Sequence, residues 1–392
     1  MLTIRLARLA ALAAILLPAA ALAQPALREV RMEVYAPPGT PIPRFKVDAA
    51  WPEIPADGTL GQVSGVAVDA QDNVWIVQRP NTLAAAENGL IQTPPWTVGC
   101  CRPLPPVIAF SPAGTIIKSF GGPAAAPVVD GVNQWPNNMH GMFVAKDNTL
   151  WFGGNGEGDH VIFNYTVDGK FIRQLGRKGQ TKGNLDQATL GNPADVNDED
   201  GEVMIADGYL NERVIAFDSK TSQFKWVIGA YGGAPAVTDP ARITQVRKEG
   251  AEPNGKTLSN VVHCVVKTRD RHVYVCDRLN NRGQVYREDA AGKLTFETEF
   301  TLATQSFGSG AVTDIAFSPD QKYVYVVDIS NGFVWILLRA THQPLARIGK
   351  VGRYAGEFIA AHNVATDSKG NLYVTEVGTG QRIQKFVFDG VR

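Results

Sequence analysis

One sequence module recurs six times along this chain of 392 residues, and no other feature constrains the fold as strongly. Each copy opens on one residue followed by a short apolar run, continues into a turn rich in Asp, Asn, Lys or Gly, and leads into a second apolar run. The opening positions, called anchors below, are Ser64, His140, Ala194, His263, Thr313 and His362. Turn residues between short β-branched and aromatic runs are typical of β-hairpins. We therefore expect every copy to begin with an antiparallel hairpin.

A third and a fourth strand follow in most copies, for example at 213–217 and 225–229. Four strands per copy describe a propeller blade, and the anchors lie 49 to 76 residues apart, at or above the usual blade period of roughly 40 to 50 residues. The sequence thus predicts an all-β, six-bladed β-propeller over 61–392, preceded by a lead-in segment at 24–60. The surplus falls in long loops at 80–106, 121–136 and 229–258, and such loops are more often functional than idle.

The first 23 residues have the form of a secretory signal. Arg5 and Arg8 precede an apolar stretch that ends in Ala21-Leu22-Ala23, an Ala-x-Ala cleavage site. We expect a secreted or periplasmic protein. Without this segment the formal charge is −2, with 36 basic against 38 acidic residues. That balance suggests neither nucleic acid nor an anionic membrane as a partner, and no other stretch is apolar enough to cross a bilayer.

Four cysteines remain for an oxidising compartment. Cys264 and Cys276 lie nearly opposite each other on one predicted hairpin and could form a bridge if their Cβ vectors allow it. Cys100 and Cys101 are adjacent, and three states are open to them: a strained adjacent bridge, bonds elsewhere, or free thiols. Without a second pair at ligand spacing, they are a weak signal for a metal.

Three of the six histidines stand at anchors, in copies two, four and six. Alternate blades of a six-bladed ring are related by about 120°, so His140, His263 and His362 are expected to form a triangle around the axis. Neutral imidazoles suit zinc, and three protein ligands leave the fourth position open for water or substrate. The other histidines, His160, His272 and His342, are interpreted as structural.

The residues around these histidines resemble the peptidyl-α-hydroxyglycine α-amidating lyase family, within the NHL-repeat six-bladed propellers. The resemblance runs from about Gly61 to Phe388. Its most selective parts are the three positioned histidines together with Asp207-Gly208-Tyr209. The Asp-x-x-x-Asn-x-Arg pattern that ends at Arg213 marks only an NHL repeat.

The resemblance implies a role for each matching position. His140, His263 and His362 would hold zinc, and Tyr209 would be the general base. Arg79 would be an active-site cation, and Arg278 a second arginine near the substrate. The remaining positions match a structural calcium site: the backbone oxygens of Val66 and Met142, and Asn363 where the family has an aspartate. An amide oxygen still binds a hard cation, but the lost charge should weaken that site.

The chemistry expected of this set is cleavage of a carbinolamide into an amide and an aldehyde such as glyoxylate. Tyr209, beside zinc and an arginine, would take the hydroxyl proton, because neighbouring positive charge favours phenolate. Arg79 or Arg278 would hold a substrate carboxylate by paired hydrogen bonds. Structural ion pairs are expected instead from the third-strand arginines and from acidic residues at the ends of second strands. These are Arg213, Arg282 and Arg382, with Asp207, Asp277 and Asp328.

Two departures from the family leave the small-molecule or peptide substrate open: Ala360 replaces a methionine and Leu210 replaces a cysteine. Two other functions also stay open. One is a non-catalytic propeller that binds a protein, peptide or glycan. The other is a metal-dependent lactonase or hydrolase, whose site would draw on carboxylates around calcium; the acidic residues of this chain do not gather at the anchors.

Overall fold

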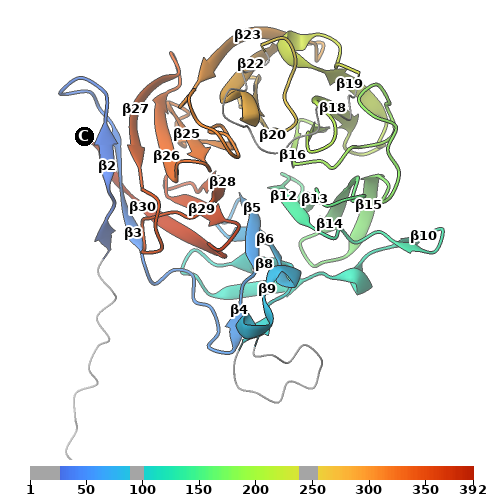
Figure 1. Ribbon diagram of the computed structural model, residues 1–392, viewed down its shortest axis with the longest axis horizontal. Coiled ribbons are helices and arrows are strands. Elements are labelled where there is room, and N and C mark those ends of the chain that lie inside the picture. Colours follow the sequence, from blue (N-terminus) through green and yellow to red (C-terminus); the bar gives the residue numbers. More distant parts are fainter. Residues whose placement is uncertain (1–26, 89–100, 238–254) are drawn as a thin grey trace, which may run out of the picture.

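The computed structural model describes residues 27–88, 101–237 and 255–392 (Figure 1). The predicted signal sequence at 1–23 lies outside these residues, as do parts of the loops at 80–106 and 229–258. Within the described residues the helices are short 3-10 turns. None of the helices there has the length and apolar composition that crossing a membrane requires.

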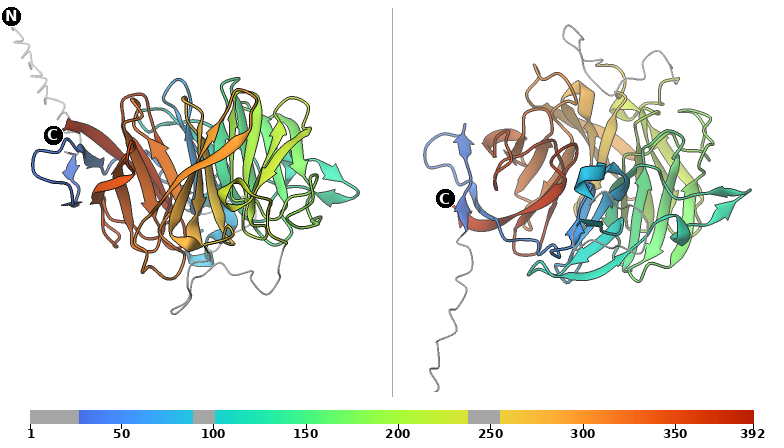
Figure 2. Two further views of the ribbon diagram at one scale, coloured as in Figure 1. Left: turned by 90° about the horizontal axis from the view of Figure 1, so that it is seen from above. Right: turned by 60° about the horizontal axis from the view of Figure 1, so that its bottom comes forward.

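Six sheets stand around a central axis, and the chain passes from one to the next in sequence order, which confirms the six-bladed propeller (Figure 1). Seen from the side, the strands run through the thickness of a disc (Figure 2). Blade one consists of β5 (Gln62–Val68), β6 (Val74–Arg79), β8 (Val107–Phe110) and β9 (Ile116–Phe120). Blade two consists of β12 (Met139–Val144), β13 (Thr149–Gly154), β14 (Val161–Thr166) and β15 (Phe171–Gly176). Blade three consists of β16 (Asp195–Glu199), β17 (Glu202–Asp207), β18 (Arg213–Asp218) and β19 (Phe224–Ile228).

Blades four to six repeat the antiparallel order from the axis outwards. Blade four consists of β20 (Val262–Lys267), β21 (His272–Asp277), β22 (Arg282–Glu288) and β23 (Leu294–Thr301). Blade five consists of β24 (Asp314–Phe317), β25 (Tyr323–Asp328), β26 (Phe333–Leu338) and β27 (Gln343–Ile348). Blade six begins with β28 (Ala361–Thr366), β29 (Leu372–Glu376) and β30 (Arg382–Val391). The innermost strands contact one another all the way round, so the ring is closed.

The lead-in segment at 24–60 supplies the strands that complete the ring. Blade six has only three strands from its own copy, and β3 (Pro43–Asp48) pairs with β30 as the fourth. Strand β1 (Arg28–Glu29) pairs with β3, and β2 (Met32–Val34) pairs with β27 of blade five. In Figure 1 these blue strands lie beside the red end of the chain. The two ends of the described chain are therefore joined by backbone hydrogen bonds.

Burial explains which residues form the middle strands. Every residue of β6, β17 and β25 is buried, because each of these strands is covered on both faces by neighbouring blades. Such strands are expected as nearly continuous apolar runs, and the Tyr-Val-Tyr-Val-Val of β25 is one. The outer strand β23 instead alternates half-buried and exposed residues, as expected of a strand with one wet face.

One of the two predicted cysteine pairs is resolved. Cys264 and Cys276 are paired residues of β20 and β21 and form a disulfide, with Cα atoms 4.8 Å apart. This bridge joins the two inner strands of blade four. Cys101 is also disulfide-bonded, and Cys100 lies outside the described residues.

Candidate metal centre

The three anchor histidines meet at the axis of the ring. Their ring centroids are 4.7 Å (His140 to His362), 4.8 Å (His263 to His362) and 4.9 Å (His140 to His263) apart. One nitrogen of each ring lies within 4.8 Å of the corresponding nitrogens of the other two. All three side chains are at most 2% exposed. The triangle expected from the repeat spacing is therefore present, and it is compact enough for one cation to be shared.

Local irregularities at the anchors accompany this arrangement. The pairing of β12, β20 and β28 with their second strands shifts register at the histidine, and that of β5 shifts at Ser64 in the same way. Strands β16 and β24 pair with their second strands in one register. β-Bulges re-aim side chains and often occur beside active sites. Gly141, directly after His140, has φ +60°, and a Cβ there would press against the Ala194 carbonyl oxygen. A side chain at this position would therefore disturb the bulge that carries His140.

Each imidazole uses Nδ1 for a hydrogen bond to the protein. His140 donates to the carbonyl oxygen of Ala194 at 2.5 Å, and His263 donates to that of Thr313 at 2.7 Å. His362 instead faces the side-chain oxygen of Asn363 at 2.6 Å. Because a carbonyl oxygen only accepts, Nδ1 carries the proton in His140 and His263. Their Nε2 atoms then hold a lone pair.

The Nε2 atom of His263 is buried and has no hydrogen-bond partner, and that of His140 lies 3.1 Å from the Tyr209 hydroxyl. An unpartnered buried nitrogen is costly, and a metal ion would satisfy it. Burial is the main cause that lowers the pKa of all three imidazoles, to about 3 for His362. The rings are therefore neutral at physiological pH, as metal ligation requires. The donor set fits zinc.

Tyr209 stands beside this triangle. Its hydroxyl lies 3.1 Å from His140 Nε2 and 3.1 Å from Arg278 Nη1, and the Arg278 guanidinium lies 5.4 Å from the centre of the tyrosine ring. Gly208 makes this approach possible, because a Cβ there would collide with the backbone of Val262. The Asp-Gly-Tyr sequence thus brings a hydroxyl from blade three against a histidine from blade two.

Arg79, the last residue of β6, is the other arginine that the resemblance assigns to the site, and two hydrogen bonds fix its guanidinium. Its Nε donates to the carbonyl oxygen of Met139 at 2.7 Å, and its Nη1 donates to Gln62 Oε1 at 3.0 Å. Burial lowers the pKa of Arg79 to about 10, so it stays a cation at neutral pH. Its positive charge adds to the lowering of the pKa of all three anchor histidines.

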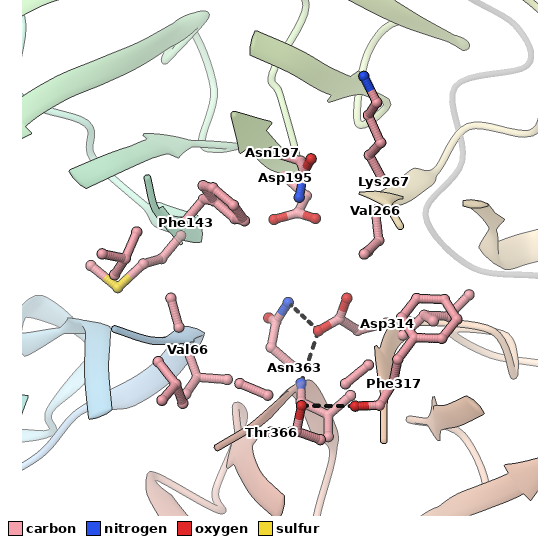
Figure 3. A pocket seen from close by; sticks show the side chains of 18 of the residues that line it. Val66, Phe143, Asp195, Asn197, Val266, Lys267, Asp314, Phe317, Asn363 and Thr366 are labelled. Carbon is pink, nitrogen blue, oxygen red and sulfur yellow. Dashed lines mark hydrogen bonds between the residues drawn. The ribbon is translucent and has the colours of Figure 1, made fainter. Parts of the chain in front are cut away.

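The residues matched to a calcium site line a separate part of the channel, a cavity of about 370 Å³ (Figure 3). Val66, Met142 and Asn363 border it. The Asn363 oxygen, however, is engaged by His362, and its amide nitrogen donates to Asp314 at 3.0 Å. The Asn363 oxygen is therefore directed at His362 rather than into the cavity, and the reaction proposed for this site does not depend on calcium.

Two acidic residues that the sequence analysis did not assign to a site also line this cavity. Asp195 and Asp314 follow the anchors Ala194 and Thr313 by one residue and line the channel. The anchors themselves carry no acidic residue, as expected, but the next residue is acidic in these two copies. Both are buried, and burial raises the pKa of each carboxyl; Asp314 raises that of Asp195 further. The signal in the sequence was an acidic residue directly after a small anchor, at the start of β16 and of β24.

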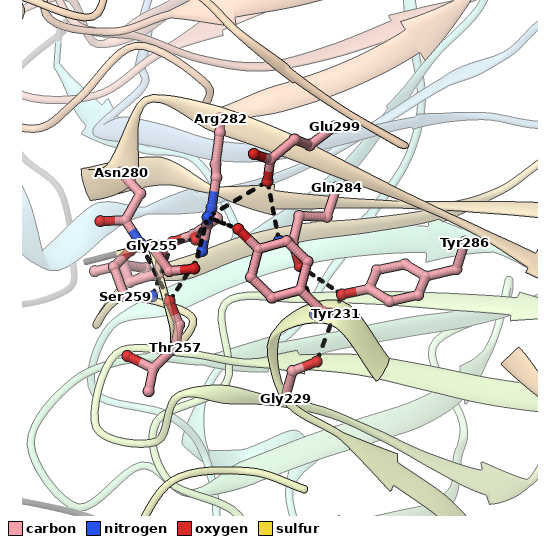
Figure 4. A network of polar contacts seen from close by, with 12 residues as sticks. Gly229, Tyr231, Gly255, Thr257, Ser259, Asn280, Arg282, Gln284, Tyr286 and Glu299 are labelled. Atoms are coloured by element: carbon pink, nitrogen blue, oxygen red, sulfur yellow. Dashed lines mark hydrogen bonds and ion pairs between the residues drawn. The ribbon is translucent and has the colours of Figure 1, made fainter. Parts of the chain in front are cut away.

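The residues predicted to be structural have partners of their own within the protein. Arg213 and Asp207 form a fully buried ion pair at 2.9 Å, and Arg282 and Asp277 form another at 2.7 Å. Figure 4 shows the second pair's surroundings. Arg382 pairs with Glu376 rather than with an aspartate. Asp328 accepts from Trp335 Nε1, and His160 Nδ1 accepts from the Asn192 backbone N–H. His272 lies 3.2 Å from Asp270 and 3.0 Å from Glu297, and His342 Nε2 lies 3.0 Å from the Tyr274 hydroxyl.

Known proteins similar to this chain include NHL-repeat proteins. The chain is 26% identical over 357 residues to NHL repeat-containing protein 3 of Mus musculus, a match that covers 88% of this chain and 84% of the relative. The protein of the same name from Homo sapiens is 24% identical with the same coverage. No family model matches. These relatives support the NHL-repeat propellers as a group and do not single out the amidating lyases.

Solved propellers also resemble the chain. The Cps50 (Swd1) β-propeller domain of Myceliophteria thermophila is 11% identical, with a TM-score of 0.49 over 83% of this chain and 96% of that one. A streptogramin B lyase is 12% identical, with a TM-score of 0.47 over 88% and 98% of the two chains. At these scores the likeness adds nothing to the strand topology described above.

Proposed function

We propose that this protein is a zinc-dependent lyase that cleaves the C–N bond of a carbinolamide-type substrate, giving an amide and an aldehyde such as glyoxylate. One observation carries the proposal: three neutral, buried imidazoles converge, with one Nε2 unpartnered, beside a tyrosine hydroxyl and two arginines. A structural cluster of histidines would be expected to complete its own hydrogen bonds.

His140, His263 and His362 would hold the metal, and bound zinc lowers the pKa of a hydroxyl that it ligates. The protein's own contribution is proton transfer and substrate binding. Tyr209 takes the proton of the substrate hydroxyl, and Arg278 at 3.1 Å stabilises the resulting phenolate. As the C–N bond breaks, its electron pair goes to the leaving amide nitrogen, and the hydroxyl oxygen becomes the aldehyde carbonyl. Tyr209 then returns the proton to that nitrogen, so the protons balance.

Arg79 and Arg278 supply the positive charge for a substrate carboxylate. Both come from outside the histidine-bearing strands, Arg79 from the end of β6 and Arg278 from the turn after β21. A guanidinium binds a carboxylate through two parallel hydrogen bonds. This charge would favour a carbinolamide that bears an acid group, such as an α-hydroxyglycine peptide. We also propose, from residues 1–23, that the protein acts outside the cytoplasm. Calcium bound in the channel would take no part in the reaction.

The test has two stages. Purified protein is first analysed for metal, and one zinc per chain that disappears in His263→Ala supports the centre. Calcium alone would favour a hydrolase, and no metal would favour a binding propeller. The zinc-loaded protein is then incubated with an α-hydroxyglycine peptide, and glyoxylate is measured. Tyr209→Phe should lower kcat by about 10²- to 10⁴-fold, the usual contribution of a general base, with the zinc content unchanged. Zinc binding without glyoxylate release would remove this substrate class.

A further inference from the structure

His362 differs from the other two anchor histidines in what holds its ring. His140 and His263 donate to backbone carbonyl oxygens of the following blade. His362 faces a side chain, the Asn363 oxygen, at 2.6 Å. An amide side chain presents either an acceptor or a donor, depending on its orientation. The backbone of Ser64 is a further partner of the ring, so the orientation of Asn363 helps to fix the tautomer of His362 and does not fix it alone.

Asp314 provides that orientation. Its Oδ2 lies 3.0 Å from Asn363 Nδ2 and also accepts the Val364 backbone N–H at 2.8 Å (Figure 3). The same Oδ2 atom accepts from the Val364 backbone, so it acts as an acceptor, and the group of Asn363 that faces it is the amide nitrogen. The amide oxygen must then face His362, and Nδ1 of that ring must be the donor. The backbone N–H of Asn363 is itself fixed by Thr375 Oγ1 at 3.0 Å.

We propose that Asp314 is a positioning residue for the metal centre, acting through Asn363 to hold His362 in the tautomer whose Nε2 lone pair is free for the metal. The inference rests on the proposed zinc site. Hydrogen bonds to the non-ligating nitrogen of a metal-bound histidine fix its tautomer and ring orientation, and losing them commonly costs about 10- to 100-fold in metal affinity. The Ser64 carbonyl is a lesser partner of the same ring, so weakened rather than abolished binding is expected.

Asp195 offers a matched control within the same channel. It occupies the equivalent position in blade three, one residue after its anchor, and its Oδ2 accepts the Val265 N–H at 3.4 Å, as Asp314 accepts that of Val364. The residue of blade four equivalent to Asn363 is Cys264, which is tied up in the disulfide. His263 donates to a backbone oxygen instead. Asp195 thus shares the burial and the raised pKa of Asp314, but it lacks the hydrogen bond to an asparagine that holds a histidine.

The experiment compares Asp314→Asn, Asn363→Ala, the double variant and Asp195→Asn in the full chain. Zinc affinity is measured by competition with a chromophoric chelator. The tautomer of His362 is read in metal-free protein from long-range ¹H–¹⁵N correlations of ¹⁵N-labelled histidine, which needs neither zinc nor activity. We expect Asp314→Asn to weaken zinc binding by about 10- to 100-fold and to increase the Nε2–H form of His362. Asp195→Asn should change zinc affinity by less than about threefold, because no side-chain hydrogen bond connects Asp195 to an anchor histidine.

Asn363→Ala should match Asp314→Asn in zinc affinity, and the double variant should lose no more than either single one, because both act through one chain of hydrogen bonds. The inference is overturned if Asp314→Asn keeps the wild-type tautomer and affinity, or weakens zinc no more than Asp195→Asn does. Should Asp314→Asn fail to fold, Asn363→Ala decides by the same two measurements. Wild-type protein that binds no zinc would defeat the proposed function, while the tautomer comparison would still decide the role of Asp314.

Discussion

Two buried polar clusters of this propeller differ in whether the protein supplies a hydrogen-bond partner for each of their polar atoms. Around Arg282, the guanidinium donates to Asp277, to the Tyr231 hydroxyl and to the Thr257 carbonyl oxygen (Figure 4). These partners tie blade four to the two described ends of the 229–258 loop. Around the three anchor histidines, the Nδ1 atoms have partners while the Nε2 atom of His263 has none.

This difference distinguishes a cluster with a structural role from a candidate binding site. A buried polar group whose partners are all supplied by the protein stabilises one conformation, provided that the geometry is good. Polar atoms that are left incomplete and aimed at one point retain the capacity to bind something else. On this comparison the Arg282 cluster holds residues 231 and 257 against blade four, and the histidine centre is the place where a metal and a substrate would act. The three predictions that follow test this division.

Arg282→Leu should have the largest effect on stability and little effect on zinc. Removing one partner of a buried ion pair leaves the carboxylate of Asp277 unpaired, which costs about 3 to 5 kcal/mol. We expect that loss in urea unfolding, with one zinc per chain retained by the folded protein. Arg287→Leu, an exposed position of the same strand, is the control and should stay within about 0.5 kcal/mol of wild type. Loss of zinc in Arg282→Leu at temperatures where it is folded would contradict the division.

His263→Ala should show the reverse pattern. Zinc sites with four ligands bind with about 10 to 16 kcal/mol, so one ligand is worth roughly 3 kcal/mol, or more than about 100-fold in affinity. Chelator competition measures this loss. The unfolding free energy of the metal-free protein should change less than in Arg282→Leu, because the imidazole has one hydrogen bond and one orphaned nitrogen. His160→Ala, a buried histidine that is not an anchor, should keep its zinc.

The smallest effect is expected from pH on the metal-free protein. Burial lowers the pKa of His362 to about 3, below its value near 6.5 in the unfolded chain. Its contribution to stability is therefore complete above pH 6.5 and is lost as the pH falls, by up to about 1.4 kcal/mol per pH unit. Asp195 and Asp314, with raised pKa values, act in the opposite direction.

The His362→Gln variant separates these contributions, since it keeps both aspartates. Urea unfolding of wild type and variant between pH 7 and pH 5 should show wild-type stability falling more steeply by about the stated slope. Equal slopes would mean that His362 is protonated in the folded state, which is incompatible with a ready metal ligand.

Much of the fold and the centre could be predicted because the repeats carry the information locally. Turn residues and apolar runs mark the strands, and the anchor position identifies His140, His263 and His362 as equivalent. The N-terminal contribution was harder to foresee: residues 43–48 complete blade six, a pairing across more than 300 residues that no local pattern records. Asp195 and Asp314 were missed because they sit one residue beyond the aligned anchors. The loop residues outside the described ranges stay untested.

The sequence by itself determined the number of blades and the equivalence of the three anchor histidines, because strand periodicity and repeat register depend only on neighbouring positions. Only the tertiary structure decided how the ring closes, which nitrogen of each histidine is free, and that Asn363 connects His362 to Asp314. The physical reason is that hydrogen-bond partners from different blades meet only after the ring has formed, and the direction of each bond depends on bulges and side-chain orientations that no single repeat encodes.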